Sequence, residues 1–324
     1  MQIKLSGTDV LTFDCSAEVR TVFEQLFMNF YYSREESFER DFYSDLTGIT
    51  KDFWKKVFKI YGDAVSNYQV FVPAGRSFFS VVAANVFSII QQGNEIDPFL
   101  TNFGFNYQNQ RRKYLRTFLN GVQLNNAELE FEDLSTRILR GEYQSENNLD
   151  FLVHNDEHRV HLANASSGQQ EILPMLILLR TFFHERWTSD QFPGVTFYIE
   201  EPEAHLFPTA QREIVELLAV LFEFTGEHFQ FVITTHSPYV LTSINNLLEA
   251  GRIRLESSDA KMQHRLSEII PSSRQLSPEH ISAYELKQGK IQDLSDPETG
   301  LLLAESLDAV SENIAIDFEK LLDI

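Results

Sequence analysis

The sequence predicts an α/β fold in which a parallel sheet is flanked by helices. Strand and helix patterns alternate after Leu152, and this alternation is typical of parallel sheets whose strands are joined by helices. Before that point the pattern is mainly helical, with one β-branched and aromatic strand at Tyr68–Val72. The chain has 324 residues, 43% of them hydrophobic, which is enough for a sizeable core.

Three helices are expected in the first half of the chain. In each, apolar residues recur at spacings of three and four, so each helix would present an apolar stripe to a neighbour. Gly62 and Gly93 follow the second and third, and glycine suits the left-handed turn that ends a helix. The expected helices span 16–30, 52–61 and 77–92.

We expect the chain to divide near residue 150. From Gly93 to Asp150 the pattern weakens into polar helical pieces, with a loop over 145–148. The prediction is therefore an N-terminal part with a largely helical insert lobe, 1–150, followed by a second lobe, 151–324.

In the second lobe, strands and helices are expected in alternation. Glu200 and Glu201 end one apolar strand, and His236 follows another. Because functional groups collect at the carboxyl ends of parallel strands, we expect these three side chains at one edge of the sheet. The expected strands are 159–162, 195–200 and 229–235, and the expected helices are 169–187, 209–222 and 239–248.

Charge limits the classes of partner. The net charge of −20 and the pI near 4.8 argue against binding of nucleic acid across the whole surface. One local basic stretch stands out, with Arg111, Arg112, Lys113 and Arg116, and at helical spacing Arg112 and Arg116 share a face. A solvated helix face is the favoured interpretation, and contact with DNA or a protein partner is the alternative.

The cysteine content and the lengths of the apolar segments indicate the cellular compartment. Cys15 is the only cysteine, which excludes internal disulfides and fits a reducing compartment. No window has the length and apolar character of a membrane span, and the N-terminus lacks a leader pattern. We predict a soluble, cytoplasmic protein without membrane contact.

The residue types at the strand ends indicate nucleotide chemistry. Mg²⁺ prefers hard oxygen ligands, and Glu200 at a strand end is the candidate ligand. Glu201 is placed to orient or deprotonate a water, and His236 at a strand-to-helix corner is placed to bond a phosphate oxygen. The alternative for the paired glutamates is a solvated loop, and for the histidine an ordinary structural role.

A serine turn precedes the long helix of the second lobe. Ser166, Ser167, Gly168 and Gln169 offer hydroxyls, backbone N–H groups and the positive end of a helix dipole to an anion. A plain N-cap is the alternative. A separate hypothesis is a metal-dependent hydrolase built on Glu200, Glu203, His205 and His236.

In this order, the segments resemble those of ABC-type ATPases, specifically the RecF, SMC and OLD-like branch. That branch includes stand-alone AAA/OLD-like ATPases of bacterial antiphage systems. Residues 166–170 resemble the ABC signature, 197–201 the Walker B strand with its catalytic glutamate, 202–206 the D-loop, and His236 the switch histidine. Residues 72–77 and 281–324 resemble the same branch more loosely.

The resemblance implies a head domain that binds ATP and Mg²⁺ and forms a homodimer with ATP between the protomers. In such a dimer the serine turn acts on the partner's nucleotide, Glu201 and His236 are catalytic, and Glu200 replaces the usual Walker B aspartate as the metal ligand. By the same resemblance, we expect an ATPase that regulates a DNA-directed or nuclease partner, an effector protein, in antiphage defence. An inactive ATPase-fold scaffold that oligomerises and sequesters an effector is the alternative.

One expected motif has no match in the sequence. No stretch fits the glycine-rich loop with Lys-Ser or Lys-Thr that holds a triphosphate, the Walker A motif. The resemblance places that loop before the other motifs, so we expect the chain to begin just past it. Three explanations remain open: the sequence is a piece of a longer protein, the loop comes from another chain, or catalysis has been lost.

Overall fold

The structure is a computed structural model, and it falls into two compact units, Met1–Tyr68 and Gln69–Ile324. In the first unit, β1 (Gln2–Leu5) and β2 (Leu11–Asp14) form an antiparallel pair. The predicted helices at 16–30 and 52–61 lie outside the described residues. The described residues are 2–5, 11–14, 68–82, 98–118, 121–146, 149–154, 156–189, 192–303 and 318.

The larger unit is built on the predicted parallel sheet. Its strands are β3 (Tyr68–Val72), β7 (Val195–Glu200) and β8 (Phe229–Thr234), in the order β3-β7-β8. β7 and β8 are parallel and in register, with Glu200 opposite Thr234. The residues that follow these two strands therefore emerge at the same edge, as the sequence predicted.

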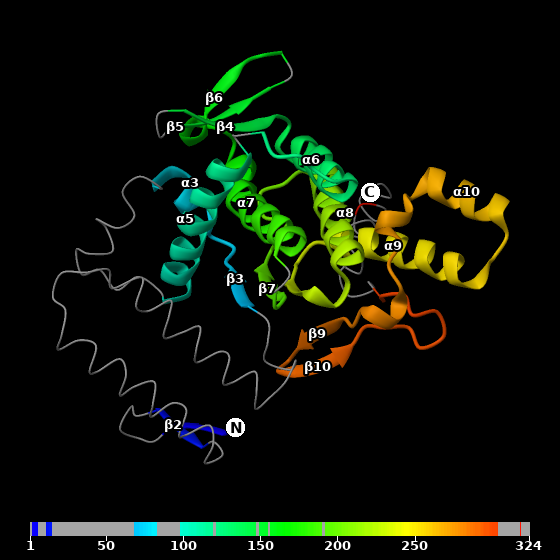
Figure 1. Cartoon of the computed structure of the whole chain (residues 1–324). Helices are drawn as coiled ribbons and strands as arrows, with labels where there is room; N and C mark the ends of the chain where they lie inside the picture. Colours follow the sequence, from blue (N-terminus) through cyan, green and yellow to red (C-terminus); the bar gives the residue numbers. More distant parts are fainter. Residues whose placement is uncertain are drawn as a thin grey trace. The chain divides into compact units, whose positions relative to one another are not determined.

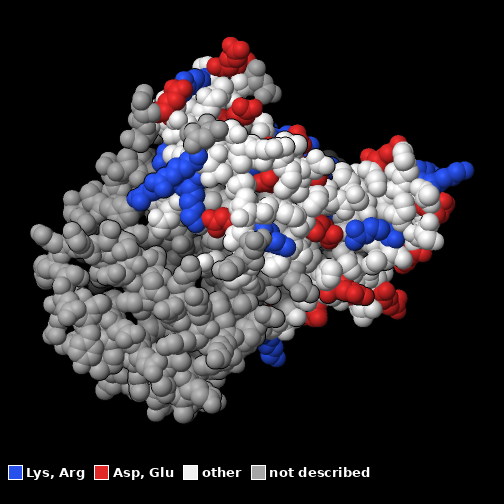
Figure 2. Space-filling model, in the orientation of Figure 1, with Lys and Arg blue, Asp and Glu red and all other residues white. Residues whose placement is uncertain are grey.

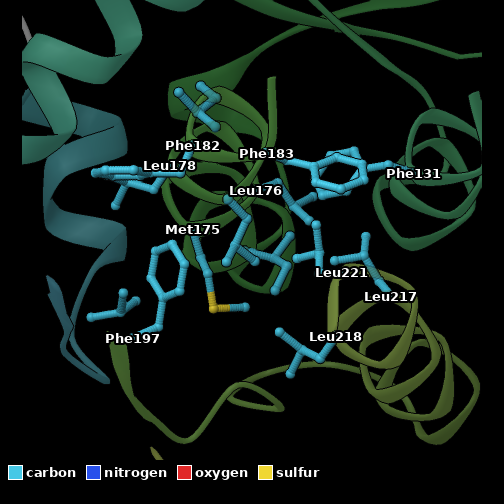
Figure 3. Packing of buried hydrophobic residues seen from close by; sticks show 14 of the residues in the cluster. Phe131, Met175, Leu176, Leu178, Phe182, Phe183, Phe197, Leu217, Leu218 and Leu221 are labelled. Atoms are coloured by element: carbon cyan, nitrogen blue, oxygen red, sulfur yellow. The ribbon is translucent and has the colours of Figure 1, made fainter. Parts of the chain in front are cut away.

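Helix α7 (Ser167–Thr188) lies at the centre of the hydrophobic core. It is buried on nearly all sides over 171–183, as expected for a helix whose apolar residues surround its axis. In Figure 3, Met175 lies near Phe197 of β7, while Leu176 lies on the side of α7 toward Phe131 and Leu221.

Two helices follow the last two sheet strands. Helix α8 (Pro208–Thr225) links β7 to β8, and α9 (Pro238–Glu256) follows β8. They pack together through a second apolar cluster that includes Val215, Ala219, Val240 and Leu248. The predicted alternation of strand, helix, strand and helix is confirmed here.

Helices α5 (Pro98–Phe118) and α6 (Asn126–Leu139) pack against α7 (Figure 1). Before them, α3 (Ser77–Val82) follows β3 and also packs against α7. The first six residues of the helix predicted at 77–92 are thus helical, while 83–92 lie outside the described residues.

Glu128 joins α6 to α7. Its Oε2 accepts a hydrogen bond from Asn125 N at 3.0 Å, which completes a capping box, and its Oε1 lies 3.0 Å from Arg180 Nη1 and 2.8 Å from His184 Nδ1. Burial acts to raise the pKa of Glu128, but the hydrogen bonds from Asn125, His184 and Arg180 outweigh it and hold the pKa below its ordinary value.

The prediction of helical pieces up to residue 150 was wrong from residue 142 onward. β4 (Glu142–Glu146) and β5 (Leu149–Val153) form an antiparallel pair, and β4 includes half of the loop predicted at 145–148. β6 (Arg159–His161), predicted for the parallel sheet, pairs antiparallel with β5 instead.

A long-range polar contact explains why these residues form strands. Asp150 accepts hydrogen bonds from Tyr143 Oη at 2.8 Å and from Arg111 Nη2 at 2.5 Å, so the hairpin is held against α5. Tertiary context of this kind overrides weak local preference.

The C-terminal part adds α10 (Ala260–Ile269) and an antiparallel hairpin of β9 (Tyr284–Lys287) and β10 (Lys290–Asp293). The division predicted at residue 150 stays a prediction; one core cluster contains residues from both sides of that position, such as Phe131 and Leu176. In the part of the chain that the structure describes, no helix has the length and apolar character needed to cross a membrane.

Candidate functional site

The carboxyl edge of β7 and β8 brings two predicted residues together. Glu201 N donates to Thr234 O at 2.9 Å, and Glu201 Oε1 lies 3.9 Å from His236 Nε2. Both side chains are open to solvent, 42% exposed for Glu201 and 87% for His236. Glu201 has a φ of 43°, a left-handed conformation that is costly for a residue with a side chain.

Glu200 faces the turn that follows the neighbouring strand. Its Oε2 accepts a hydrogen bond from Ala74 N at 3.3 Å, so the carboxylate lies beside the turn after β3. Among the described residues, Oε1 makes no further hydrogen bond. One carboxylate oxygen is thereby left for an incoming ligand.

Glu203 organises the loop on the other strand. Its Oε1 accepts hydrogen bonds from Thr235 Oγ1 at 2.5 Å and from His236 N at 3.1 Å, and the side chain is buried. Its Oε2 is buried without a hydrogen-bond partner in the described part of the chain. Glu203 therefore fixes the backbone of His236, while the imidazole remains exposed.

The serine turn is a well-formed helix N-terminus. Ser166 caps α7, with Gln169 N donating to Ser166 Oγ at 3.3 Å and Ser166 N donating to Gln169 Oε1 at 3.0 Å. Gln169 Nε2 also donates to Leu139 O at 2.7 Å. Ser166 and Ser167 are exposed. The capping interpretation thus holds for Ser166 and Gln169, and Ser167 remains open to an anion.

Gly168 joins the serine turn to the turn that follows Glu201. A Cβ placed on Gly168 would lie 2.6 Å from His205 O, closer than real Cβ atoms come. Only glycine permits this approach of the two backbones. The serine turn and the turn that follows Glu201 are therefore in direct contact within one chain.

Sequence reasoning missed two buried residues behind this edge, Arg76 and Glu171. Arg76 Nη1 and Nη2 donate to the carbonyl oxygens of Glu200 and Glu201, at 3.0 and 3.2 Å. Burial lowers the pKa of the Arg76 guanidinium, and nearby carboxylates, Glu171 first, oppose that shift. The available signal was Glu171 itself, a charge at the start of an apolar helix face, since buried charges need partners.

The metal-dependent hydrolase hypothesis finds no support in this arrangement. Among the described residues, no group of three or more His, Cys, Asp or Glu side chains could hold a metal ion. His205 is exposed, and Glu203 is engaged with the loop after β8. A magnesium ion needs less from the protein, because one or two carboxylates with substrate phosphates and water complete its shell.

Two side chains of the basic stretch of α5 form ion pairs. Arg111 is held by Asp150, and Lys113 Nζ lies 2.6 Å from Glu185 Oε1. Arg112 and Arg116 are exposed, and Figure 2 shows basic side chains gathered over this region. Of the four residues, Arg111 has a structural role.

The parallel pairing of β7 with β8 and the helices that follow each strand are consistent with a P-loop ATPase-like fold. A model of the AAA ATPase domain family matches residues 20–241, and the chain belongs to that family. The match includes every residue of the site described above. Among curated proteins, no match was found.

Proposed function

We propose that this protein binds and hydrolyses ATP with Mg²⁺ at the carboxyl edge of the sheet, as an ABC-type ATPase of the OLD-like branch. The observation that carries the proposal is that the side chains of Glu201 and His236 lie 3.9 Å apart at the carboxyl edge of the sheet. Gly168 of the serine turn contacts His205, on the turn that follows Glu201. Membership of the AAA ATPase domain family supports the ATPase class.

The donor set fits a magnesium nucleotide. Glu200 supplies a strand-end carboxylate with one oxygen engaged by Ala74 N, which suits a hard cation that keeps most of its waters. Bound Mg²⁺ offsets the charge of a triphosphate and orients its oxygens. The residues of this chain would hold the ion, position a water and receive a proton.

Glu201 is the proposed base. Its carboxylate is half-exposed, so it can contact a water molecule, while its backbone N–H is held by Thr234 O. His236, whose backbone is fixed by Glu203, is proposed to donate a hydrogen bond toward a terminal phosphate oxygen. Both roles depend on the strand ends being adjacent.

The serine turn is proposed to act across a homodimer. Ser167 is exposed at the first turn of a helix of 22 residues, where backbone N–H groups and the helix dipole favour an anion. In the proposed dimer Ser167 and Gly168 of one protomer close on the nucleotide of the other. The resemblance to ABC-type ATPases is the support for this step.

The proposed cellular role is regulation of an effector or nuclease partner in antiphage defence, and it rests on the resemblance alone. The exposed residues Arg112 and Arg116 on α5 are the proposed contact with DNA or that partner.

Phosphate release by the Glu201→Gln variant tests the proposal. The change keeps the size of the side chain and removes the base, so hydrolysis should fall by about 10²–10⁴-fold while nucleotide binding persists. Glu256→Gln on α9, an exposed carboxylate paired with Arg252, is the matched control and should hydrolyse ATP as the parent does.

The assay uses both this chain and the longest form that its gene encodes, because the sequence has no match to the triphosphate-binding loop. Hydrolysis that is equal in the parent and in Glu201→Gln would refute the assigned role. Absence of hydrolysis and of binding in every form would favour the inactive scaffold.

A further inference from the structure

We infer that Arg76, held by Glu171, is a positioning residue that ties the serine-turn helix to the peptides of Glu200 and Glu201. The inference rests on the proposed function for its catalytic consequence. Its structural part concerns contacts that exist without nucleotide. Arg76 follows β3, Glu171 lies on α7, and the two are 95 positions apart in the sequence.

All three nitrogens of the Arg76 guanidinium donate hydrogen bonds. Nη1 donates to Pro73 O at 2.9 Å and to Glu200 O at 3.0 Å, while Nη2 donates to Glu201 O at 3.2 Å. Nε donates to Glu171 O at 3.0 Å. The rigid fork of arginine thus joins the turn after β3, the end of β7 and the first turns of α7 at one point.

The carboxylate of Glu171 completes the link from the other side. Its two oxygens accept hydrogen bonds from Arg76 N and Ser77 N, each at 2.9 Å. The side chains are 0% and 1% exposed, so both charges have left water. A pair this deeply buried contributes little net stability but demands one geometry, because every lost partner would leave a charge uncompensated.

A third contact joins the same two segments. Pro174 lies within α7 and has no N–H, so it leaves the carbonyl of Gln170 without its usual helical donor. Ser80 Oγ of α3 donates to that carbonyl at 2.5 Å. The start of α7 is therefore joined to the segment after β3 by Glu171 and by Gln170.

The functional consequence follows from what Arg76 holds. Glu201 lies in a left-handed conformation, and its carbonyl accepts from both Arg76 Nη2 and Ala204 N. Removing the guanidinium would release the peptide that aims the proposed base. Arg76 is buried beneath this edge and does not face the proposed nucleotide, so it acts through Glu200 and Glu201.

The chain contains a matched control for this pair. Arg180 and Glu128 are also buried, at 1% and 3% exposed, and Arg180 is also on α7. Their bonds join α6 to α7 and reach no residue of the carboxylate edge. If Arg76 had only a structural role, Arg76→Lys and Arg180→Lys would change hydrogen exchange at the carboxyl edge of the sheet to a similar extent.

Hydrogen exchange in the absence of nucleotide tests the inference directly. Arg76→Lys keeps the charge but cannot make the forked contacts, so the amides of Glu201, Ala204 and Leu206 should exchange about tenfold faster. Arg180→Lys should leave those amides at the parental rate while it loosens α6. Parental exchange at Glu201 in Arg76→Lys, or equal acceleration in both variants, would overturn the inference.

Two further arms keep the test decisive. If Arg76→Lys fails to fold, Glu171→Gln and Ser80→Ala are measured in the same way, and the same amides should respond. In the form that turns over ATP, Arg76→Lys should lower kcat with KM for ATP unchanged, whereas Arg180→Lys should change neither. If no form binds ATP, the proposed function fails, but the exchange result still decides whether Arg76 positions the Glu201 peptide.

Discussion

Replacing Glu203 by alanine should loosen the loop that carries His236. The side chain accepts two hydrogen bonds through one oxygen, from Thr235 Oγ1 and from His236 N, and it is buried. Hydrogen bonds to a charged acceptor contribute about 1.5–3 kcal/mol each. Because His236 is exposed, water can replace part of this, so the lower end applies and Glu203→Ala should lower the free energy of unfolding by about 3 kcal/mol.

The measurement is urea unfolding followed by circular dichroism, with thermal unfolding alongside. A loss of this size corresponds to a fall in Tm of about 6–12 °C for a unit of this length. Glu203→Gln keeps an acceptor oxygen of similar position and should lose only about 1 kcal/mol.

Glu256→Ala on α9 is the matched control, since its carboxylate is 61% exposed and pairs at the surface with Arg252. Such a change should stay within about 0.5 kcal/mol of the parent. If Glu203→Ala is as stable as Glu256→Ala, the role given to Glu203 in fixing His236 is refuted.

Three other changes have defined outcomes. Gly168→Ala places a Cβ 2.6 Å from His205 O and should lower the free energy of unfolding in urea by about 1–3 kcal/mol. Gly75→Ala, with nothing within 4 Å of its Cβ, should leave that free energy nearly unchanged. Equal losses in the two variants would contradict the close approach. The folded pKa of Glu128 lies below its ordinary 4.5, so its contribution to stability is present above that pH and is lost as pH falls through the folded pKa. Glu128→Gln should therefore reduce the loss of unfolding free energy at acid pH. An unchanged dependence of that free energy on pH would contradict this. Arg112→Glu should weaken DNA binding and reduce its salt dependence, measured by fluorescence anisotropy, and unchanged affinity would dispose of the α5 contact.

The sheet and its active edge could be predicted from the sequence because their signals are local. β3, β7 and β8 are runs of β-branched and aromatic residues, and helix α8 between β7 and β8 has clear apolar periodicity. Parallel pairing then follows from the alternation, and it places Glu200 opposite Thr234. The adjacency of Glu201 and His236 is a consequence of that register.

The antiparallel sheet could not be predicted in the same way. β4 has the sequence EYQSE, which carries little strand preference of its own. Its pairing with β5 is supported by the contact of Tyr143 and Arg111 with Asp150, across up to 39 positions. Local pattern contains no information on such a contact.

Arg76 illustrates the same limit at the site. Its partners include the main-chain carbonyls of Glu200 and Glu201 and residue Glu171 on α7, and no local pattern pairs them with Arg76. A buried charge within an apolar helix, as at Glu171, is the one local sign that a distant partner must exist.

Calorimetric titration of MgATP is the most direct test of the claim that this edge is a nucleotide site. It is applied to the 324-residue chain and to the longest form that its gene encodes, each with and without Glu200→Ala. We expect binding by at least one form and weaker binding when Glu200 is removed. Binding by the longer form alone would place the triphosphate clamp outside these residues. No binding by any form, or equal binding with Glu200→Ala, would contradict the claim.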